Sequence, residues 1–145
     1  MKLTGIYLNP PATPDALKAL QRLLPPGTPR DFIDFFRKTD GAEAAFDPDW
    51  AAGEPDTIRI DSVEILTQLF SPFAGRYPHL SVIGSDAATK LIAYDMSQGS
   101  PWPIVIFESD TEDYASTFQP LAPDMSSLWH QFFSHKAPDA SSEGS

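Results

Sequence analysis

Fifteen prolines in 145 residues constrain the fold of this chain more than any other feature of its sequence. Their share is about twice the usual ~5%. Proline in the interior of a helix or of a central strand removes a backbone hydrogen bond. The prolines fall between segments with periodic apolar residues, so they predict short helices and strands joined by tight turns. We therefore expect one domain over residues 1–136, followed by a flexible polar tail over residues 137–145.

Three segments carry the sequence signals of helices. The Thr-Pro-Asp sequence at 13–15 is a typical helix start, and the apolar stripe after it ends at residue 24. Thr28 is predicted to cap a second, phenylalanine-rich helix that ends near Gly41. Asp124 is predicted to cap a third helix. The apolar residues of this third helix have the clearest helical spacing in the chain: Met125, Leu128, Trp129, Phe132 and Phe133.

The middle of the chain favours strands. Runs with apolar, β-branched or aromatic residues cover 57–60, 80–83, 91–94 and 104–107, and residues 114–121 offer one more strand. A short helix is expected after Ser62, and residues 96–103 are predicted to form a hairpin loop. Because the strands lie together between helical ends, we expect an α+β fold. Its central, mostly antiparallel sheet would be flanked by the N-terminal and C-terminal helices.

The sequence lacks the patterns on which most catalytic and cofactor sites depend. It contains no cysteine, which excludes disulfides, thiol nucleophiles and cysteine-bound zinc. His130 and His135 would lie about 140° apart around a helix, so they cannot share a metal ion without distortion. Neither a phosphate-binding glycine loop nor a Gly-x-Ser-x-Gly motif is present. We therefore expect a protein that is not an enzyme, with no catalytic residues, metal or cofactor. A carboxylate-based hydrolase is the remote alternative, because carboxylates are abundant.

The charge of the chain is strongly acidic and unevenly distributed. The formal net charge is -10 at pH 7. Residues 1–38 hold six basic and three acidic residues, whereas residues 39–145 hold four basic and seventeen acidic ones. Such a surface repels nucleic-acid phosphates and anionic lipid, so we expect neither as a partner. It would attract a basic protein through long-range steering, although solubility alone also explains an acidic surface.

Two acidic segments and two tryptophans are the candidate partner-binding residues. Tryptophan in a loop is a frequent hot spot of protein interfaces, although it can also pack on the core. The acids that follow the 104–107 strand can equally form a solvated turn that protects the strand end, and they lack the spacing of a calcium-binding loop. The candidates are Asp47, Asp49, Trp50, Glu54, Asp56, Trp102, Glu108, Asp110, Glu112 and Asp113.

Short motifs occur in a characteristic order between about residues 13 and 133. They are Leu24-Pro25, Asp40-Gly41 after the phenylalanine-rich helix, Gly84-Ser85-Asp86, Tyr94-Asp95 at a strand end, and Phe132-Phe133 in the last helix. This order resembles the SUKH superfamily of bacterial toxin-immunity proteins and fungal cell-wall regulators. Two positions depart from the pattern, because Asp40 stands where asparagine is common and Ala87-Ala88-Thr89 replaces a glycine-rich turn. The matching residues are caps, turns and core, so the resemblance bears on the fold more than on a site.

The resemblance implies a non-enzymatic binding module, and many bacterial SUKH proteins neutralise a toxin encoded beside them. We therefore expect an immunity protein that binds a cognate bacterial toxin, polymorphic or type VI-secreted, with a basic nuclease as one such toxin. The alternative is a housekeeping interaction module of the same fold without a toxin. No apolar run has the length of a signal peptide or membrane span, so we expect a cytoplasmic protein without a membrane partner. A monomer or weak homodimer is expected.

Overall fold

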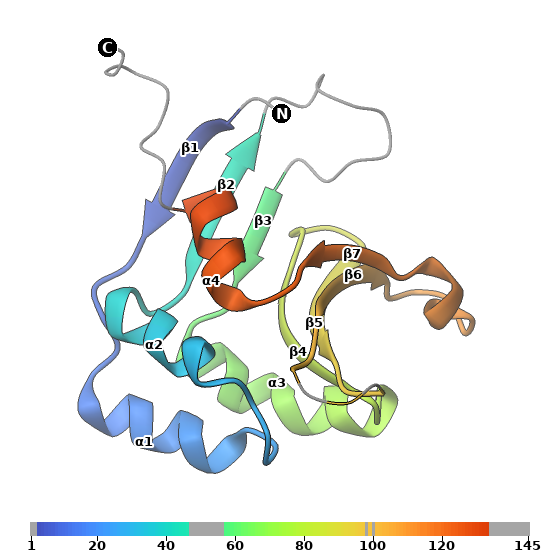
Figure 1. Ribbon diagram of the computed structural model, residues 1–145, viewed down its shortest axis with the longest axis horizontal. Helices are drawn as coiled ribbons and strands as arrows, with labels where there is room; N and C mark the ends of the chain where they lie inside the picture. The colour runs from blue at the N-terminus through green and yellow to red at the C-terminus, as the bar shows by residue number, and fades with distance from the viewer. Residues whose placement is uncertain (1–2, 47–56, 98, 100, 134–145) are drawn as a thin grey trace.

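The computed structural model describes residues 3–46, 57–97, 99 and 101–133, which form one antiparallel sheet with helices around it (Figure 1). Its strands lie in chain order: β1 (Leu3–Leu8), β2 (Ala42–Phe46), β3 (Thr57–Ile60), β4 (Leu80–Ser85), β5 (Lys90–Asp95), β6 (Ile104–Glu108) and β7 (Gln119–Ala122). Every neighbouring pair is antiparallel. The expected α+β class, with a central antiparallel sheet and helices contributed by both ends of the chain, is confirmed.

Three of the four α-helices in the described part of the chain begin after a residue whose side chain accepts from a free backbone N–H group. Thr13 Oγ1 accepts from Ala16 N at 3.1 Å, and Asp124 Oδ1 accepts from Ser127 N at 2.7 Å, as predicted. The elements are α1 (Pro14–Leu23), α2 (Arg30–Lys38), α3 (Val63–Arg76), the 3-10 turn η1 (Tyr114–Thr117), α4 (Met125–Leu128) and the π-helical turn η2 (Trp129–Phe133).

Two helix boundaries differ from the prediction. Thr28 does not cap α2, because its hydroxyl donates to the carbonyl of Pro25 at 2.7 Å and the helix begins after Pro29. The helix after Ser62 is not short, because α3 continues for 14 residues and contains Pro72. Two side chains cap its first turn, since Ser62 Oγ accepts from Ile65 N at 3.4 Å and Asp40 Oδ1 accepts from Val63 N at 2.8 Å.

The sheet curls at the junction of β3 and β4, where only two residue pairs are in register (Figure 1). Gly84 lies opposite Ile60 at this junction, beside an irregularity in the pairing of β4 with β5. A Cβ atom on Gly84 would overlap the carbonyl oxygen of Arg59. Glycine is therefore required for β3 to approach β4, which places β1–β3 and β4–β7 at an angle to one another.

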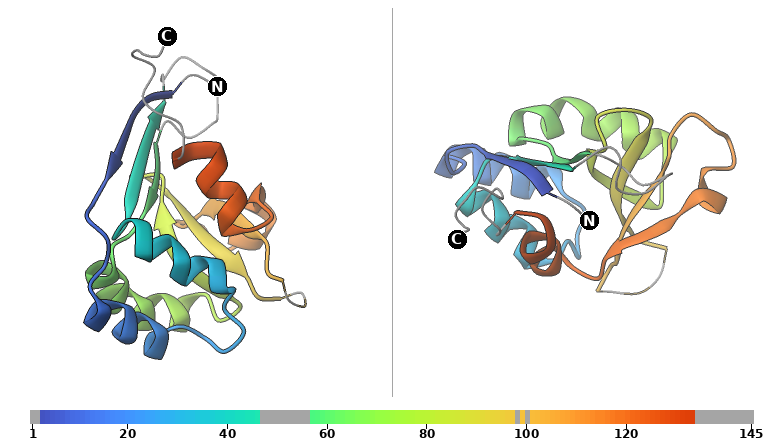
Figure 2. Two further views of the ribbon diagram at one scale, coloured as in Figure 1. Left: turned by 60° about the vertical axis from the view of Figure 1, so that its left-hand side comes forward. Right: turned by 90° about the horizontal axis from the view of Figure 1, so that it is seen from above.

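Two apolar cores lie on opposite faces of the sheet. The larger core is on the concave side, where α2 and α4 cover the strands (Figure 2). Its aromatic centre is formed by Phe32, Phe35 and Phe36. The final helix contributes four buried residues, as its spacing predicted: Met125, Leu128, Phe132 and Phe133. The smaller core lies outside β4–β6, beneath the end of α3 and η1, and contains Tyr77, Leu80, Val82, Ala93, Val105 and Phe107.

Candidate functional site

The acidic residues of the 108–113 segment lie in the turn between β6 and η1. Glu108 is half-buried at the end of β6, where Thr89 Oγ1 donates to its carboxylate at 3.1 Å and Lys90 Nζ lies 3.9 Å from it. The other three acids are exposed: Asp110, Glu112 and Asp113. In the part of the chain that the structure describes, none of these three side chains makes an ion pair. The turn therefore presents three exposed carboxylates without an ion pair, whereas Glu108, at the base of the turn, pairs with Lys90.

Ser109 anchors this acidic turn to the body of the protein. Its carbonyl oxygen accepts from Arg76 Nη2 at 3.1 Å and from Tyr77 Oη at 3.0 Å. Its backbone N–H donates to the carbonyl of Thr89 at 3.1 Å. These three hydrogen bonds fix the backbone at the start of the turn before a partner binds, so less backbone entropy is lost on binding.

Trp102, one of the two tryptophans among the candidate contact residues, is buried. Its side chain is only 9% exposed and belongs to the larger core, with its ring centroid 6.2 Å from that of Tyr94. Gly27, which has a positive φ of 94°, lets the loop between α1 and α2 lie against the indole ring. The prediction that Trp102 is a contact residue is therefore corrected, because a side chain packed between a loop and the sheet is not available to a partner.

The other predicted contact residues, Asp47, Asp49, Trp50, Glu54 and Asp56, lie outside the described residues. The strands on either side of them, β2 and β3, are adjacent in the sheet. The prediction for this acidic, tryptophan-containing segment stays a prediction.

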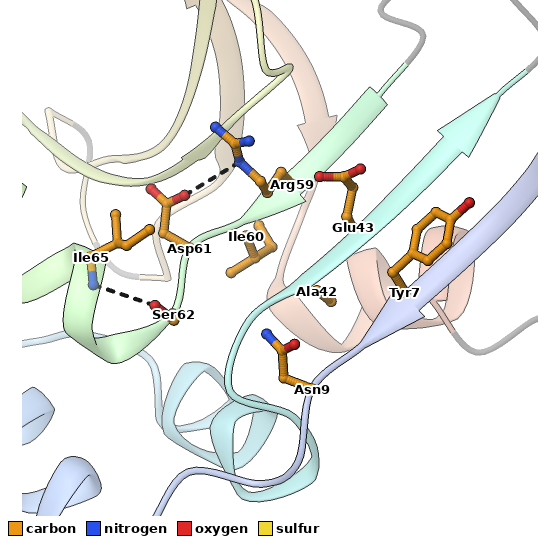
Figure 3. Close-up of a pocket in the computed structure, with 9 residues that line it drawn as sticks. All are labelled: Tyr7, Asn9, Ala42, Glu43, Arg59, Ile60, Asp61, Ser62 and Ile65. Atoms are coloured by element: carbon orange, nitrogen blue, oxygen red, sulfur yellow. Dashed lines mark hydrogen bonds and ion pairs between the residues drawn. The ribbon is translucent and has the colours of Figure 1, made fainter.

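A second candidate site lies on the outer face of β1–β3. Tyr7 pairs with Glu43, Glu43 pairs with Arg59, and Arg59 pairs with Ser85, so these four residues form one row across four strands. Tyr7, Glu43 and Arg59 border a hollow of about 270 Å³ that Asp61 and Ile65 also line (Figure 3).

Arg59 organises the charge in this hollow. Its Nε atom lies 3.6 Å from Asp61 Oδ1, and its Nη2 atom donates to Ser85 Oγ at 3.1 Å. Asp61 is only 8% exposed, and burial raises the pKa of its carboxyl group although the charge of Arg59 opposes that change. Glu43 is half-buried beside them, so the hollow combines one cation with two carboxylates.

The pKa shifts of Asp61 and Asp124 predict opposite effects of pH on stability. Because the pKa of Asp61 is raised in the folded state, protonated Asp61 stabilises the fold at pH values below the ordinary pKa of 3.8. This contribution is lost as the pH rises. Hydrogen bonds from Ser127 lower the pKa of Asp124, so its contribution is present above 3.8 and is lost as the pH falls. As the pH rises from about 3 to about 7, the free energy of unfolding of the parent should therefore decrease relative to that of Asp61→Asn. Over the same rise in pH, it should increase relative to that of Asp124→Asn.

Chemical denaturation of the three proteins at each pH measures these differences. Each variant is compared with the parent at the same pH, so the titration of the other carboxylates cancels. A parent that gains stability relative to Asp61→Asn with rising pH would contradict the description of the Arg59–Asp61 pair.

The sequence does not reveal this hollow, because its residues lie far apart along the chain. Tyr7, Glu43 and Arg59 meet only through strand register, and neither β1 nor β2 was predicted. The one usable signal was the short alternation at 57–60, which places the exposed Arg59 between the buried Ile58 and Ile60.

The aspartates that carry the SUKH resemblance have structural roles. Besides the cap that Asp40 forms, Asp86 Oδ1 accepts from Ala88 N at 2.8 Å and Lys90 N at 3.0 Å in the turn between β4 and β5. Asp95 Oδ1 accepts from Ser97 N at 3.0 Å. These contacts support the interpretation that the matching residues form caps and turns.

Within the described ranges, no three metal-ligating side chains come together, and no helix has the length and apolar character needed to cross a membrane. Comparison of the sequence with models of known protein families and with curated proteins finds no match.

Proposed function

We propose that the chain is a non-enzymatic binding protein, an immunity protein that binds a basic toxin and blocks it. The observation that carries this proposal is the acidic turn, with its three exposed, unpaired carboxylates on a firmly anchored base. Residues 91–133 contain no lysine or arginine, and two cations from elsewhere in the chain lie at the base of the turn, where Arg76 donates to the Ser109 carbonyl and Lys90 pairs with Glu108. A basic groove of a toxin such as a nuclease is the complementary surface.

The resemblance to SUKH proteins supports the same function. The motif residues occupy caps and turns in an α+β fold, and the family's bacterial members include toxin neutralisers. In this proposal the protein acts in the cytoplasm of the cell that makes the toxin. A housekeeping interaction module of the same fold is the alternative, and the identity of the adjacent gene distinguishes the two.

Charge reversal in the acidic turn is the direct test. We expect Asp110→Lys/Glu112→Lys to slow association with the product of the adjacent gene by about tenfold or more at low salt, because steering depends on local charge. Dissociation should change less. The measurement is surface-based binding kinetics of the two purified proteins.

The matched control is Asp15→Lys/Asp34→Lys. These residues are also exposed and give the same change in net charge, but they lie on α1 and α2. The control should retain most of the association rate. If both double variants slow association equally, the acidic turn is not the contact, and if the parent forms no complex the proposed function is wrong.

A further inference from the structure

Three of the four large exposed apolar side chains in the described part of the chain lie near one another, whereas the fourth, Leu8, follows Tyr7 in β1 and faces the other side of the sheet. Among the described residues, the four large exposed apolar side chains are Tyr7 (62%), Leu8 (49%), Ile65 (42%) and Leu69 (37%). Two belong to the edge strand β1 and two to the first half of α3. Tyr7 and Ile65 line the same hollow (Figure 3). Exposed apolar residues gathered in this way are typical of an interaction surface.

The apolar surface continues along α3. Ile65, Leu69, Pro72 and Arg76 are separated by four, three and four positions, so they follow one face of the helix. All four are exposed, whereas Val63 and Leu66 are buried. We name Tyr7, Ile65, Leu69 and Pro72 the outer strip. The right panel of Figure 2 shows α3 on the opposite side of β1–β3 from α2 and α4.

The outer strip has an excess of carboxylates at both ends, because Glu43 and Asp61 outnumber Arg59 in the hollow and the three exposed acids of the turn outnumber Arg76. At its start, Glu43 and Asp61 line the hollow with Tyr7 and Ile65. At its end, Arg76 donates to the carbonyl of Ser109, which places the acidic turn beside the last residues of α3. The helical rise from Ile65 to Arg76 is about 16 Å. The strip and the acidic turn therefore form one continuous surface.

We infer that the outer strip binds an apolar segment of the partner that is flanked by lysine or arginine residues. This inference rests on the proposed function and specifies the surface it uses. The apolar side chains of the partner would contact Ile65, Leu69 and Tyr7. Its basic residues would lie near the hollow at one end and near the acidic turn at the other.

The charge of the strip's surroundings favours a basic partner over a second copy of this chain. Two strips packed together would bring ends with an excess of carboxylates over arginine against each other or against apolar side chains, in a chain of net charge -10. Like charges across an interface disfavour association. A basic partner removes this repulsion and covers the same apolar residues.

Variants of the strip that preserve the fold test the inference. Tyr7→Thr and the double variant Ile65→Gln/Leu69→Gln replace exposed side chains with residues suited to a strand and a helix. Gln131→Ala, an exposed position in η2, is the control. The probe is the product of the adjacent gene. We expect the double variant to dissociate at least about tenfold faster, with a smaller change in association, because apolar contacts act mainly on dissociation. Circular dichroism confirms that each variant is folded.

The outcomes separate this inference from the proposed function. One outcome is that charge reversal in the acidic turn weakens the complex, whereas the two strip variants bind like the control Gln131→Ala. In that case the proposed function stands and the strip is not the contact. If the parent binds no product of the adjacent gene, both fail. Sedimentation of the free protein gives a further result. If the parent is a dimer and the Ile65→Gln/Leu69→Gln variant is a monomer, a second copy of the chain occupies the strip. That result also overturns the inference.

Discussion

Replacing Phe36 with alanine is expected to lower the free energy of unfolding by about 3–5 kcal/mol. The Phe36 side chain is fully buried, and its ring centroid lies 5.1 Å from those of Phe32 and Phe35 in edge-to-face contacts. The rings hold α2 against the concave face of the sheet, so the substitution leaves a cavity and removes aromatic contacts.

Urea denaturation of the parent and of Phe36→Ala measures this loss. The exposed Gln131→Ala is a suitable control, because surface substitutions usually change stability by less than about 0.5 kcal/mol. A loss below about 1 kcal/mol for Phe36→Ala would contradict the assignment of Phe36 to a tightly packed core.

Gly84→Ala is expected to destabilise the protein by about 3 kcal/mol, at the upper end of overpacking effects. The added methyl group would overlap the backbone of Arg59 in the neighbouring strand, and backbone cannot move aside as a flexible side chain can. The junction of β3 and β4 would have to open, and with it the row that holds Arg59 beside Ser85.

Gly75→Ala is the matched control for this prediction. Gly75 lies in α3, and a Cβ atom there would have no neighbour within 4 Å. Alanine in place of glycine within a helix stabilises by about 0.5–1 kcal/mol. The two substitutions should therefore change the thermal midpoint in opposite directions, and a Gly84→Ala protein as stable as the parent would contradict the close approach of the two strands.

The sequence predicted the elements whose apolar spacing is strong. The last helix is the clearest case, since Met125, Leu128, Phe132 and Phe133 are all buried as expected. The strands β5 and β6 and the hairpin that joins them were also predicted, because their apolar runs are bounded by turn residues. Periodicity of this kind is local, so a single sequence is enough to reveal it.

The strands β1 and β2 could not be predicted in the same way. β2 contains three alanines, which have low strand propensity, and β1 has Gly5 at an irregularity of its pairing. These strands form through pairing with each other and with β3. The hollow around Arg59 depends on that pairing, so it could not be seen before the register was known.

Trp102 shows the same limit at a single residue. Its position between Pro101 and Pro103 indicates a loop, and the loop is present in the structure. Burial of the indole comes from Gly27 and Tyr94, which are distant in sequence. The acidic turn, by contrast, was predicted from its composition and lies on the surface as expected, because three charged side chains without partners are costly to bury.

The association rate of the parent protein with the product of the adjacent gene, measured from low to high salt, decides whether this chain is an acidic binding protein. An anchored acidic turn predicts fast association that falls steeply as salt rises, by about tenfold or more, and a smaller slope for Asp110→Lys/Glu112→Lys. Dissociation should depend on the apolar outer strip and respond weakly to salt. An association rate that is unaffected by salt, or the absence of any complex, would contradict the proposal.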